Sequence, residues 1–156
     1  NAMNGAATLK LVDIVISANS KSLTIHLGLF TPNKIKQPVP AFLLICNRPP
    51  DENIDFSRKK KSEFWPAEEV IAQGYAVAAF YNGDVDPDKH DEFQNGIHEL
   101  LDSNRNAESW GTLAAWAWGA SRCLDYLVSD KAIAADKIRA EGKRHFRQAL
   151  PISVLP

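Results

Sequence analysis

Three carboxylates at alternate positions are the first side chains in this sequence whose spacing could do chemistry. They belong to Asp84, Asp86 and Asp88. Alternate acids occur in calcium-binding loops, but an EF-hand loop also needs a glycine after the third acid and a glutamate at its twelfth position. Lys89 and Asn95 occupy those positions. The pattern therefore favours a turn held by Asx side chains, with no metal or cofactor, and keeps the three acids as candidate binding residues.

Nucleophilic thiols and imidazoles are few and do not form a recognisable catalytic spacing. Cys46 and Cys123, the only cysteines, lack metal-ligand or redox spacing, so we expect packed free thiols that indicate no compartment. His26 falls on the polar side of a predicted strand, and His90 and His98 flank the acidic stretch. His26 is predicted to face solvent, and so are His90 and His98 unless the fold brings either of them beside an acid.

The overall charge gives no signal for a polyanionic partner. Eighteen basic and 19 acidic residues leave a net charge of −1 over 156 residues. The basic run Arg58–Lys61 is followed by Glu63, Glu68 and Glu69, which is typical of a solvated loop. No apolar run approaches the length of a membrane span, and no basic-then-apolar leader precedes the fold. We expect neither a nucleic-acid nor a membrane partner.

The elements that must position these residues alternate between strands and helices. Two stretches of alternating apolar residues predict a β-hairpin, and two continuous apolar runs separated by a helical pattern predict buried parallel strands. In chain order these elements are hairpin strands at Leu9–Ile16 and Leu23–Leu29 around a turn at residues 17–21, a strand at Val39–Cys46, a long polar excursion at Asn47–Lys61, a helix at Pro66–Gly74 and a strand at Tyr75–Phe80.

A long helix is predicted from Ser109 to Asp130, and a short strand at Asp136–Glu141 follows it. One face of this helix is apolar, and residues on the opposite side are apolar too. Such a pattern is typical of a helix that is buried nearly all round. The face contains Leu113, Trp116, Ala117, Ala120, Leu124 and Leu127, with Ala114 and Trp118 opposite. The whole chain, 1–156, is predicted to form a single α/β domain: a three-layer αβα sandwich whose mostly parallel sheet opens with an antiparallel hairpin.

Several motifs lie within this frame: Phe64-Trp65-Pro66, Gly74-Tyr75-Ala76-Val77-Ala78, Gly83 to Asp88, Trp110-Gly111, Ala115 to Arg122, and Leu124 to Leu127. Together they resemble the glucuronoyl esterases and related acetyl xylan esterase-like proteins. The resemblance covers most of the chain up to Gly142, and its tryptophan-rich segment is the most specific part. It implies a partial α/β-hydrolase fold and, for intact members, cleavage of esters in plant cell-wall polysaccharides by a Ser-His-acid triad.

The chain departs from this family where the resemblance places the nucleophile. In the relatives, the strand after the long helix ends in Gly-His-Ser-Arg-Leu-Gly-Lys, a sharp strand-to-helix turn. Alignment on Gly142 puts Lys143 at the histidine, Arg144 at the nucleophile and His145 at the arginine. The family's acid and triad histidine come from later strands, beyond Pro156. Without these groups the triad mechanism has no route, so no catalytic residue is assigned.

A serine elsewhere imitates the missing motif in its letters. Gly119-Ala120-Ser121-Arg122 looks like a nucleophile turn, but such a turn follows a strand, whereas Ser121 lies within the helical pattern. We interpret Ser121 as a helix residue and give little weight to a Ser121-His145 pair.

The tail at residues 143–156 is predicted to be foreign to the family. Permitted codons for Glu141 to Pro156, read with the triplet boundary moved back one base, allow Gly-Lys-Ala-Ser-Leu-Ser-Ala-Gly-Ala-Ala-Asp-Gln-Arg-Ser-Ala. That peptide resembles the family sequence after the nucleophile. We therefore hypothesise a deletion with a frameshift; gene codons that cannot spell the offset peptide would rule it out.

The sequence is compatible with three functions. The first is a truncated, catalytically inactive relative of carbohydrate esterases. The second is a non-catalytic carbohydrate-binding or assembly module, which would use the loop Asp84–Asp88 with Asn47–Asn53 to hold a polysaccharide fragment. The third, with the least support, is a distinct enzyme that uses the loop acids.

The resemblance also suggests what the chain could bind and where it could act. A sheet without its later strands would leave an apolar edge near Ile138 or a tail at Ala149–Leu155 to pair with a second copy, so self-association is expected. The resemblance implies secreted or periplasmic relatives, but no signal peptide is present and the compartment stays open. Asn1-Ala2-Met3 resembles an expression-tag remnant joined to a start methionine.

Overall fold

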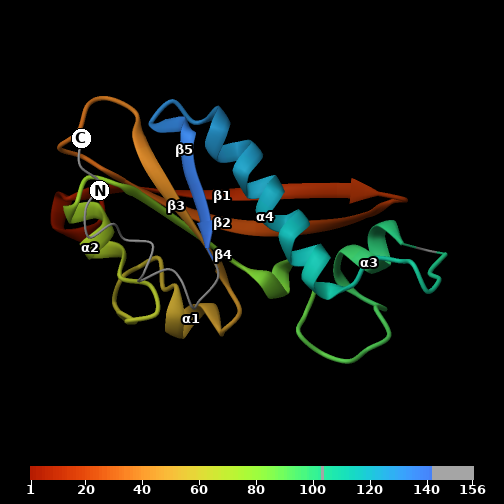
Figure 1. Ribbon diagram of the computed structural model, residues 1–156. Helices are drawn as coiled ribbons and strands as arrows, with labels where there is room; N and C mark the ends of the chain where they lie inside the picture. Colours follow the sequence, from red (N-terminus) through yellow and green to blue (C-terminus); the bar gives the residue numbers. More distant parts are fainter. Residues whose placement is uncertain (103, 142–156) are drawn as a thin grey trace.

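A computed structural model describes residues 1–102 and 104–141 of the chain, which form a five-stranded mixed sheet with helices on both faces (Figure 1). The strands lie in the order β1-β2-β4-β3-β5. Along the chain the elements are η1 (Met3–Gly5), β1 (Ala7–Ala18), β2 (Lys21–Pro32), β3 (Val39–Cys46), α1 (Pro50–Asn53), α2 (Ala67–Ala72), β4 (Ala76–Tyr81), η2 (Asn82–Asp84), α3 (Gly96–Leu101), α4 (Thr112–Ser129) and β5 (Ile133–Glu141).

The sheet combines an antiparallel hairpin with a parallel half, as the sequence predicts. β1 and β2 pair along their whole length, from Ala7 opposite Pro32 to Ala18 opposite Lys21. β4 joins the end of this hairpin antiparallel through Gly28 to Phe30. β3 then pairs in parallel with β4 on one side and with β5 on the other. The two long apolar runs therefore become adjacent strands in the middle of the sheet.

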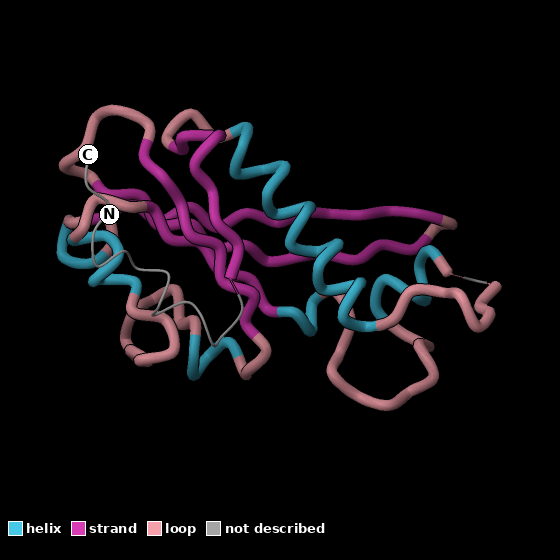
Figure 2. Tube along the Cα trace, viewed as in Figure 1, coloured by secondary structure: helices cyan, strands magenta, loops and turns pink. Residues whose placement is uncertain are grey.

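Helices lie on both faces of the sheet (Figure 2). Alternation along the strands divides the core into two layers, one on each of these faces. Leu43 of β3 and Ala78 of β4 pack under α3 and α4, while Leu44 and Ala79 pack on the opposite face with α2 and Trp65. All four of these strand residues are fully buried. The predicted three-layer αβα arrangement is therefore confirmed, because strands buried on both faces need a helical cover on each.

The helix predicted at Pro66–Gly74 is present as α2, and its ends follow ordinary capping rules. Pro66 precedes the first helical residue, and Glu68 and Glu69 lie in the first turn, where carboxylates favour the helix dipole. Gly74 has φ +87°, the left-handed conformation that commonly follows a helix. The chain then enters β4 directly, so this cap sets the start of the central strand.

Two loop predictions need correction. The hairpin turn is shorter than residues 17–21, because the strands extend to Ala18 and resume at Lys21; only Asn19 and Ser20 turn, both with positive φ. The stretch between the second buried strand and the long helix also contains the short helices η2 and α3, which the sequence reading treated as loop. Short helices escape periodicity because they complete too few turns to show a repeat.

The prediction that α4 is buried nearly all round is wrong. Its buried stripe consists of Ala115, Gly119, Ala120, Cys123 and Leu127. Leu113 of the predicted core face is 76% exposed, and Val128 is 52% exposed. Only one narrow face of the helix, made mostly of small residues, packs on the sheet. The other side is apolar in composition but remains largely uncovered.

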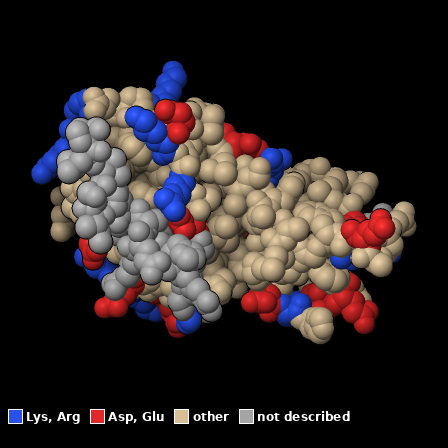
Figure 3. Space-filling view, viewed as in Figure 1, with Lys and Arg blue, Asp and Glu red and all other residues tan. Residues whose placement is uncertain are grey.

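Charged side chains are interspersed on the face drawn in Figure 3, where lysine and arginine lie among aspartate and glutamate. Within the described ranges, no helix has the length and hydropathy needed to cross a bilayer. Cys46 and Cys123 are buried free thiols, as predicted.

Truncation of two of the α4 leucines, Leu113 and Leu127, should separate the buried stripe from the exposed side. We expect Leu127→Ala to lower the free energy of unfolding by about 2–5 kcal/mol, because it leaves a cavity in the core. Leu113→Ala should stay within about 0.5 kcal/mol of the parent chain, since its side chain is exposed. Urea denaturation followed by circular dichroism measures both. Equal losses for the two variants would contradict this placement of α4.

The buried thiols should be unreactive while the chain is folded. Burial raises the pKa of the Cys123 thiol to about 12, with a smaller contribution from the Asp84 carboxylate, and burial also raises the pKa of Cys46. Because the raised pKa keeps the thiol protonated at neutral pH, and the thiolate is the nucleophile, alkylation by iodoacetamide should be slow until denaturant is added. Mass spectrometry of labelled peptides measures this. Rapid labelling of Cys123 without denaturant would refute its burial.

Candidate functional site

The parallel strands β3, β4 and β5 all end at one edge of the sheet. Cys46 lies opposite Tyr81, and Leu44 lies opposite Glu141. Ligands of open α/β sheets bind outside the carboxyl ends of such strands. The acidic stretch that follows β4 and the residues that follow Cys46 therefore begin side by side at the edge where a site is expected.

Asp84 fastens this edge to the hairpin. Its carboxylate accepts hydrogen bonds from the His26 backbone N–H at 2.9 Å and lies 3.0 Å from His26 Nδ1. The strand pairing between β2 and β4 ends at Gly28. Beyond that point the Asp84 carboxylate replaces a neighbouring strand as the acceptor for the His26 N–H. The imidazole of His26 is 62% exposed, in agreement with the predicted surface position.

Val85 is the contact point for both α3 and α4. Its carbonyl accepts the Ile97 N–H at 2.8 Å, and its side chain packs against Gly119 of α4. A Cβ at Gly119 would lie 2.5 Å from Val85 Cγ2, and a Cβ at Gly96 would lie 2.3 Å from the Val85 carbonyl oxygen. The two glycines are therefore needed for both helices to approach this residue.

Asp86 is buried beside His98, which the sequence reading placed in solvent. Asp86 is 2% exposed and His98 is fully buried, with 3.6 Å between Asp86 Oδ2 and His98 Nε2. The Trp116 indole N–H donates to the Asp86 carbonyl at 2.7 Å. His98 does not face solvent, because Ile97 and Leu100 of α3 turn toward the core and carry the histidine between them. It lies beside an acid, which is the exception that the prediction allowed. His90 is exposed as predicted.

The three candidate acids do not converge on one point. Asp84 faces His26, Asp86 faces His98, and Asp88 is exposed. Across the described ranges, no group of three histidine, cysteine or carboxylate side chains is arranged to hold a metal ion. A binding role for these acids remains a prediction.

Two aromatic rings, one edge-on and one tilted against the imidazole, and one guanidinium also pack around His98. The His98 imidazole lies 4.9 Å, centroid to centroid, from both Phe93 and Trp110. The guanidinium carbon of Arg105 lies 3.8 Å from the centre of the Phe93 ring, and its Nη2 donates to the Trp110 carbonyl at 2.8 Å. Sequence reading missed Arg105 and Trp110 as partners, because nothing in their spacing signals a shared buried imidazole.

Phe93 and Arg105 also line a cavity of about 480 Å³. Its lining combines donors, acceptors and one aromatic ring: Lys89, His90, Asp91, Glu92, Phe93, Arg105 and Thr112. Glu92 and Phe93 both have positive φ, at 58° and 62°, in a turn where the Phe93 N–H donates to Asp91 Oδ1 at 3.1 Å. The cavity lies on the chain segment that joins the acidic stretch to α3 and α4.

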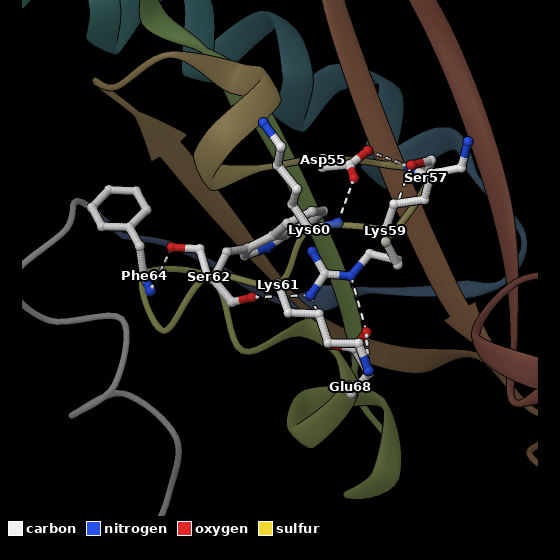
Figure 4. Close-up of polar contacts among 10 residues, drawn as sticks. Asp55, Ser57, Lys59, Lys60, Lys61, Ser62, Phe64 and Glu68 are labelled. Atoms are coloured by element: carbon white, nitrogen blue, oxygen red, sulfur yellow. Dashed lines mark hydrogen bonds and ion pairs between the residues drawn. The ribbon is translucent and has the colours of Figure 1, made fainter.

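The basic run is only partly the solvated loop that its sequence predicts (Figure 4). Lys59, Lys60 and Lys61 are exposed, but Arg58 is 8% exposed and stacks over Trp65 at 4.9 Å. The Arg58 guanidinium donates to both oxygens of Glu68, at 3.1 and 2.7 Å. Burial opposes ionisation of Glu68, but these bonds outweigh it and lower the pKa of that carboxyl. Arg58 therefore forms a structural ion pair with Glu68, next to the core layer that contains α2 and Trp65.

The turn around this run is closed by an aspartate. Asp55 accepts hydrogen bonds from the Lys60 N–H at 2.9 Å and the Ser57 N–H at 2.8 Å, as Figure 4 shows. The bond from the Lys60 backbone is the main cause that lowers the pKa of the Asp55 carboxyl. These local bonds orient the loop and leave the lysine side chains outside it.

The residues nearest to the family's catalytic position give no nucleophile within the described part of the chain. Ser121 lies inside α4, as predicted, and its hydroxyl accepts a hydrogen bond from Arg122 at 3.2 Å. β5 ends at Glu141, whose carboxylate accepts a hydrogen bond from Arg139 Nε. Arg144 and His145, with the predicted tail, lie outside the described residues.

Comparison with known proteins identifies relatives over most of the chain. The family model "Glucuronyl esterase, fungi" matches residues 14–143. A carbohydrate esterase from an unknown prokaryotic organism is 28% identical over an alignment of 171 residues, which covers 90% of this chain and 39% of the relative. A glucuronoyl esterase from Solibacter usitatus superimposes with a TM-score of 0.75 at 30% identity, covering 90% of this chain and 42% of that structure.

A further structure supports the fold alone. A glucuronoyl esterase from Teredinibacter turnerae has a TM-score of 0.74 at 23% identity, covering 94% of this chain and 38% of that structure. The chain thus spans about two fifths of the length of the relatives it matches. Because the family model covers well over half of the sequence, this chain belongs to the glucuronyl esterase family of carbohydrate esterases, on a partial α/β-hydrolase-like fold.

Proposed function

We propose that this chain is a scaffold portion of a glucuronyl esterase that does not, by itself, hydrolyse esters through the family's Ser-His-acid triad. One observation carries the proposal: β5 is the strand after the long helix, and the position that the resemblance assigns to the nucleophile is Arg144. A guanidinium stays protonated and has no lone pair to offer a carbonyl carbon.

The described histidines and serines support the same proposal. The side chains of His26 and His98 contact Asp84 and Arg105 rather than a serine hydroxyl. Ser121 lies on a regular helix, whereas an attacking serine needs a tight turn that exposes its oxygen and a nearby base to take its proton. Among the described residues, the edge of the sheet thus brings no serine hydroxyl into contact with a histidine.

A second candidate function is carbohydrate binding without catalysis, and the cavity beside Arg105 favours it. Its lining offers Lys89 and Arg105 as donors, Asp91 and Glu92 as acceptors, and the ring of Phe93. Polar groups of both kinds around an aromatic ring suit a polyhydroxylated ligand, and about 480 Å³ is within the usual range for small-ligand pockets. The acids Asp84 to Asp88 would then position the wall rather than touch the sugar.

Ester hydrolysis separates the scaffold from an enzyme. With a chromogenic acetate ester and a methyl ester of glucuronic acid as substrates, we expect no saturable turnover above the buffer rate. An intact glucuronoyl esterase serves as the positive control. Turnover that persists in the double variant Ser121→Ala, His145→Ala would reveal a different catalytic site and contradict the proposal, as would turnover that depends on either residue.

Calorimetric titration with glucuronoxylan fragments distinguishes the second function from the first. If the cavity binds sugar, the parent chain should give a saturable heat that Glu92→Ala weakens and that the distant surface variant Glu52→Ala leaves unchanged. Both carboxylates are exposed, so neither change should unfold the chain. No heat at millimolar sugar, or the same heat in both variants, would exclude this cavity as the binding surface.

We also propose that the chain self-associates through β5. Among the described strands, β5 pairs only with β3, so its outer edge offers unpaired backbone groups that could bind the same edge of a second copy. The measured mass in multi-angle light scattering should therefore rise toward that of a dimer as concentration increases. A constant mass of 17.3 kDa at high concentration would contradict pairing.

A further inference from the structure

His98 is the one buried histidine among residues 1–102 and 104–141, and it contacts three charged groups. Besides Asp86 on the segment after β4, these are Asp102 after α3 and Arg105 before α4. His98 Nδ1 lies 2.9 Å from Arg105 Nη1 and 3.6 Å from Asp102 Oδ2. Phe93 and Trp110 cover the ring, so the imidazole is shielded from water and its partners are these side chains.

The contact with Arg105 determines which ring nitrogen carries the proton. A guanidinium can only donate, so His98 Nδ1 must accept through its lone pair. The imidazole is then neutral, and its single proton lies on Nε2. That N–H points toward buried Asp86 but has no hydrogen-bond partner, since the separation of 3.6 Å exceeds hydrogen-bond length.

A second arrangement of the same groups becomes favourable when His98 gains a proton. A proton on Nδ1 would face the Arg105 N–H, so this contact must break. The two ring N–H groups would then have a carboxylate on each side, Asp86 near Nε2 and Asp102 near Nδ1, both 3.6 Å away. Small movements of the two carboxylates toward the ring would convert these separations into charge-assisted hydrogen bonds, which are stronger than neutral ones.

Arg105 transmits this exchange to the cavity. It donates to Asp102 and to the Trp110 carbonyl and stacks on Phe93, and both Arg105 and Phe93 line the cavity. When protonated His98 competes for Asp102, the Arg105 guanidinium loses its contact with the imidazole. It must then also share the Asp102 carboxylate with His98. The stacked pair that forms the cavity wall is thereby loosened on one side.

We propose that His98 is a proton-controlled clasp between the acidic stretch and the α3–α4 connection. In its neutral form the imidazole accepts from Arg105 and holds the cavity wall. In its protonated form it bridges Asp86 and Asp102 and releases Arg105 from the ring. The proposal does not depend on whether the chain binds sugar or cleaves esters.

Nitrogen-15 NMR of the histidine rings in the full chain tests the clasp. At neutral pH the His98 ring should carry its proton on Nε2, with an unprotonated Nδ1. Acidification should protonate Nδ1 and, with the same midpoint, shift the Arg105 side-chain signals and the indole N–H signal of Trp110, because a cationic imidazole would then lie against the indole. His98→Gln should abolish the coupled changes, while the exposed His90→Gln should retain them.

Two results would overturn the proposal. One is a His98 ring with its proton on Nδ1 at neutral pH, which would deny the acceptor role toward Arg105. The other is protonation of His98 without any change at Arg105 or Trp110. Both are read from the parent chain, so they decide the question even if His98→Gln fails to fold.

Discussion

The three residues Asp84, Val85 and Asp86 hold the structure together where the central strand β4 ends. The Asp84 carboxylate satisfies the backbone of β2, and Val85 receives α3 through its carbonyl and α4 through its side chain. Asp86 binds the indole of Trp116 through its carbonyl and lies beside His98. Because these contacts come from elements far apart in sequence, displacing this one segment would disturb the hairpin and both helices at once.

This constraint explains why the edge of the sheet is ordered although no nucleophile is assigned there. The carboxyl ends of β3, β4 and β5 meet beside the acidic segment, which is where members of the glucuronyl esterase family should place their chemistry. The packing of α4 on Val85 requires Gly119. This first residue of Gly119-Ala120-Ser121-Arg122, which looks like a nucleophile turn, therefore has a structural role. The proposed lack of triad hydrolysis concerns the attacking group, and it is compatible with an intact scaffold.

Features set by short-range patterns could be predicted from the sequence, and features set by distant partners could not. The apolar run Val39–Cys46 gave a strand with those bounds, because continuous burial leaves a direct signal in composition. His98 and Arg58 look like surface residues, yet both are buried because acids and aromatic rings from other segments surround them. Leu113 shows the reverse error, since helix periodicity reports an apolar side without telling whether anything covers it.

The central proposal is that no serine among residues 1–102 and 104–141 is activated as a nucleophile. Fluorophosphonate probes react covalently with activated serines, and peptide mass spectrometry locates the modified residue. The predicted result is that folded and urea-unfolded chains are labelled equally weakly, with Ser121 no different from the other serines. A serine that is labelled rapidly in the folded chain and slowly after unfolding would contradict the claim, because only a folded site can supply the base and the turn that activate it.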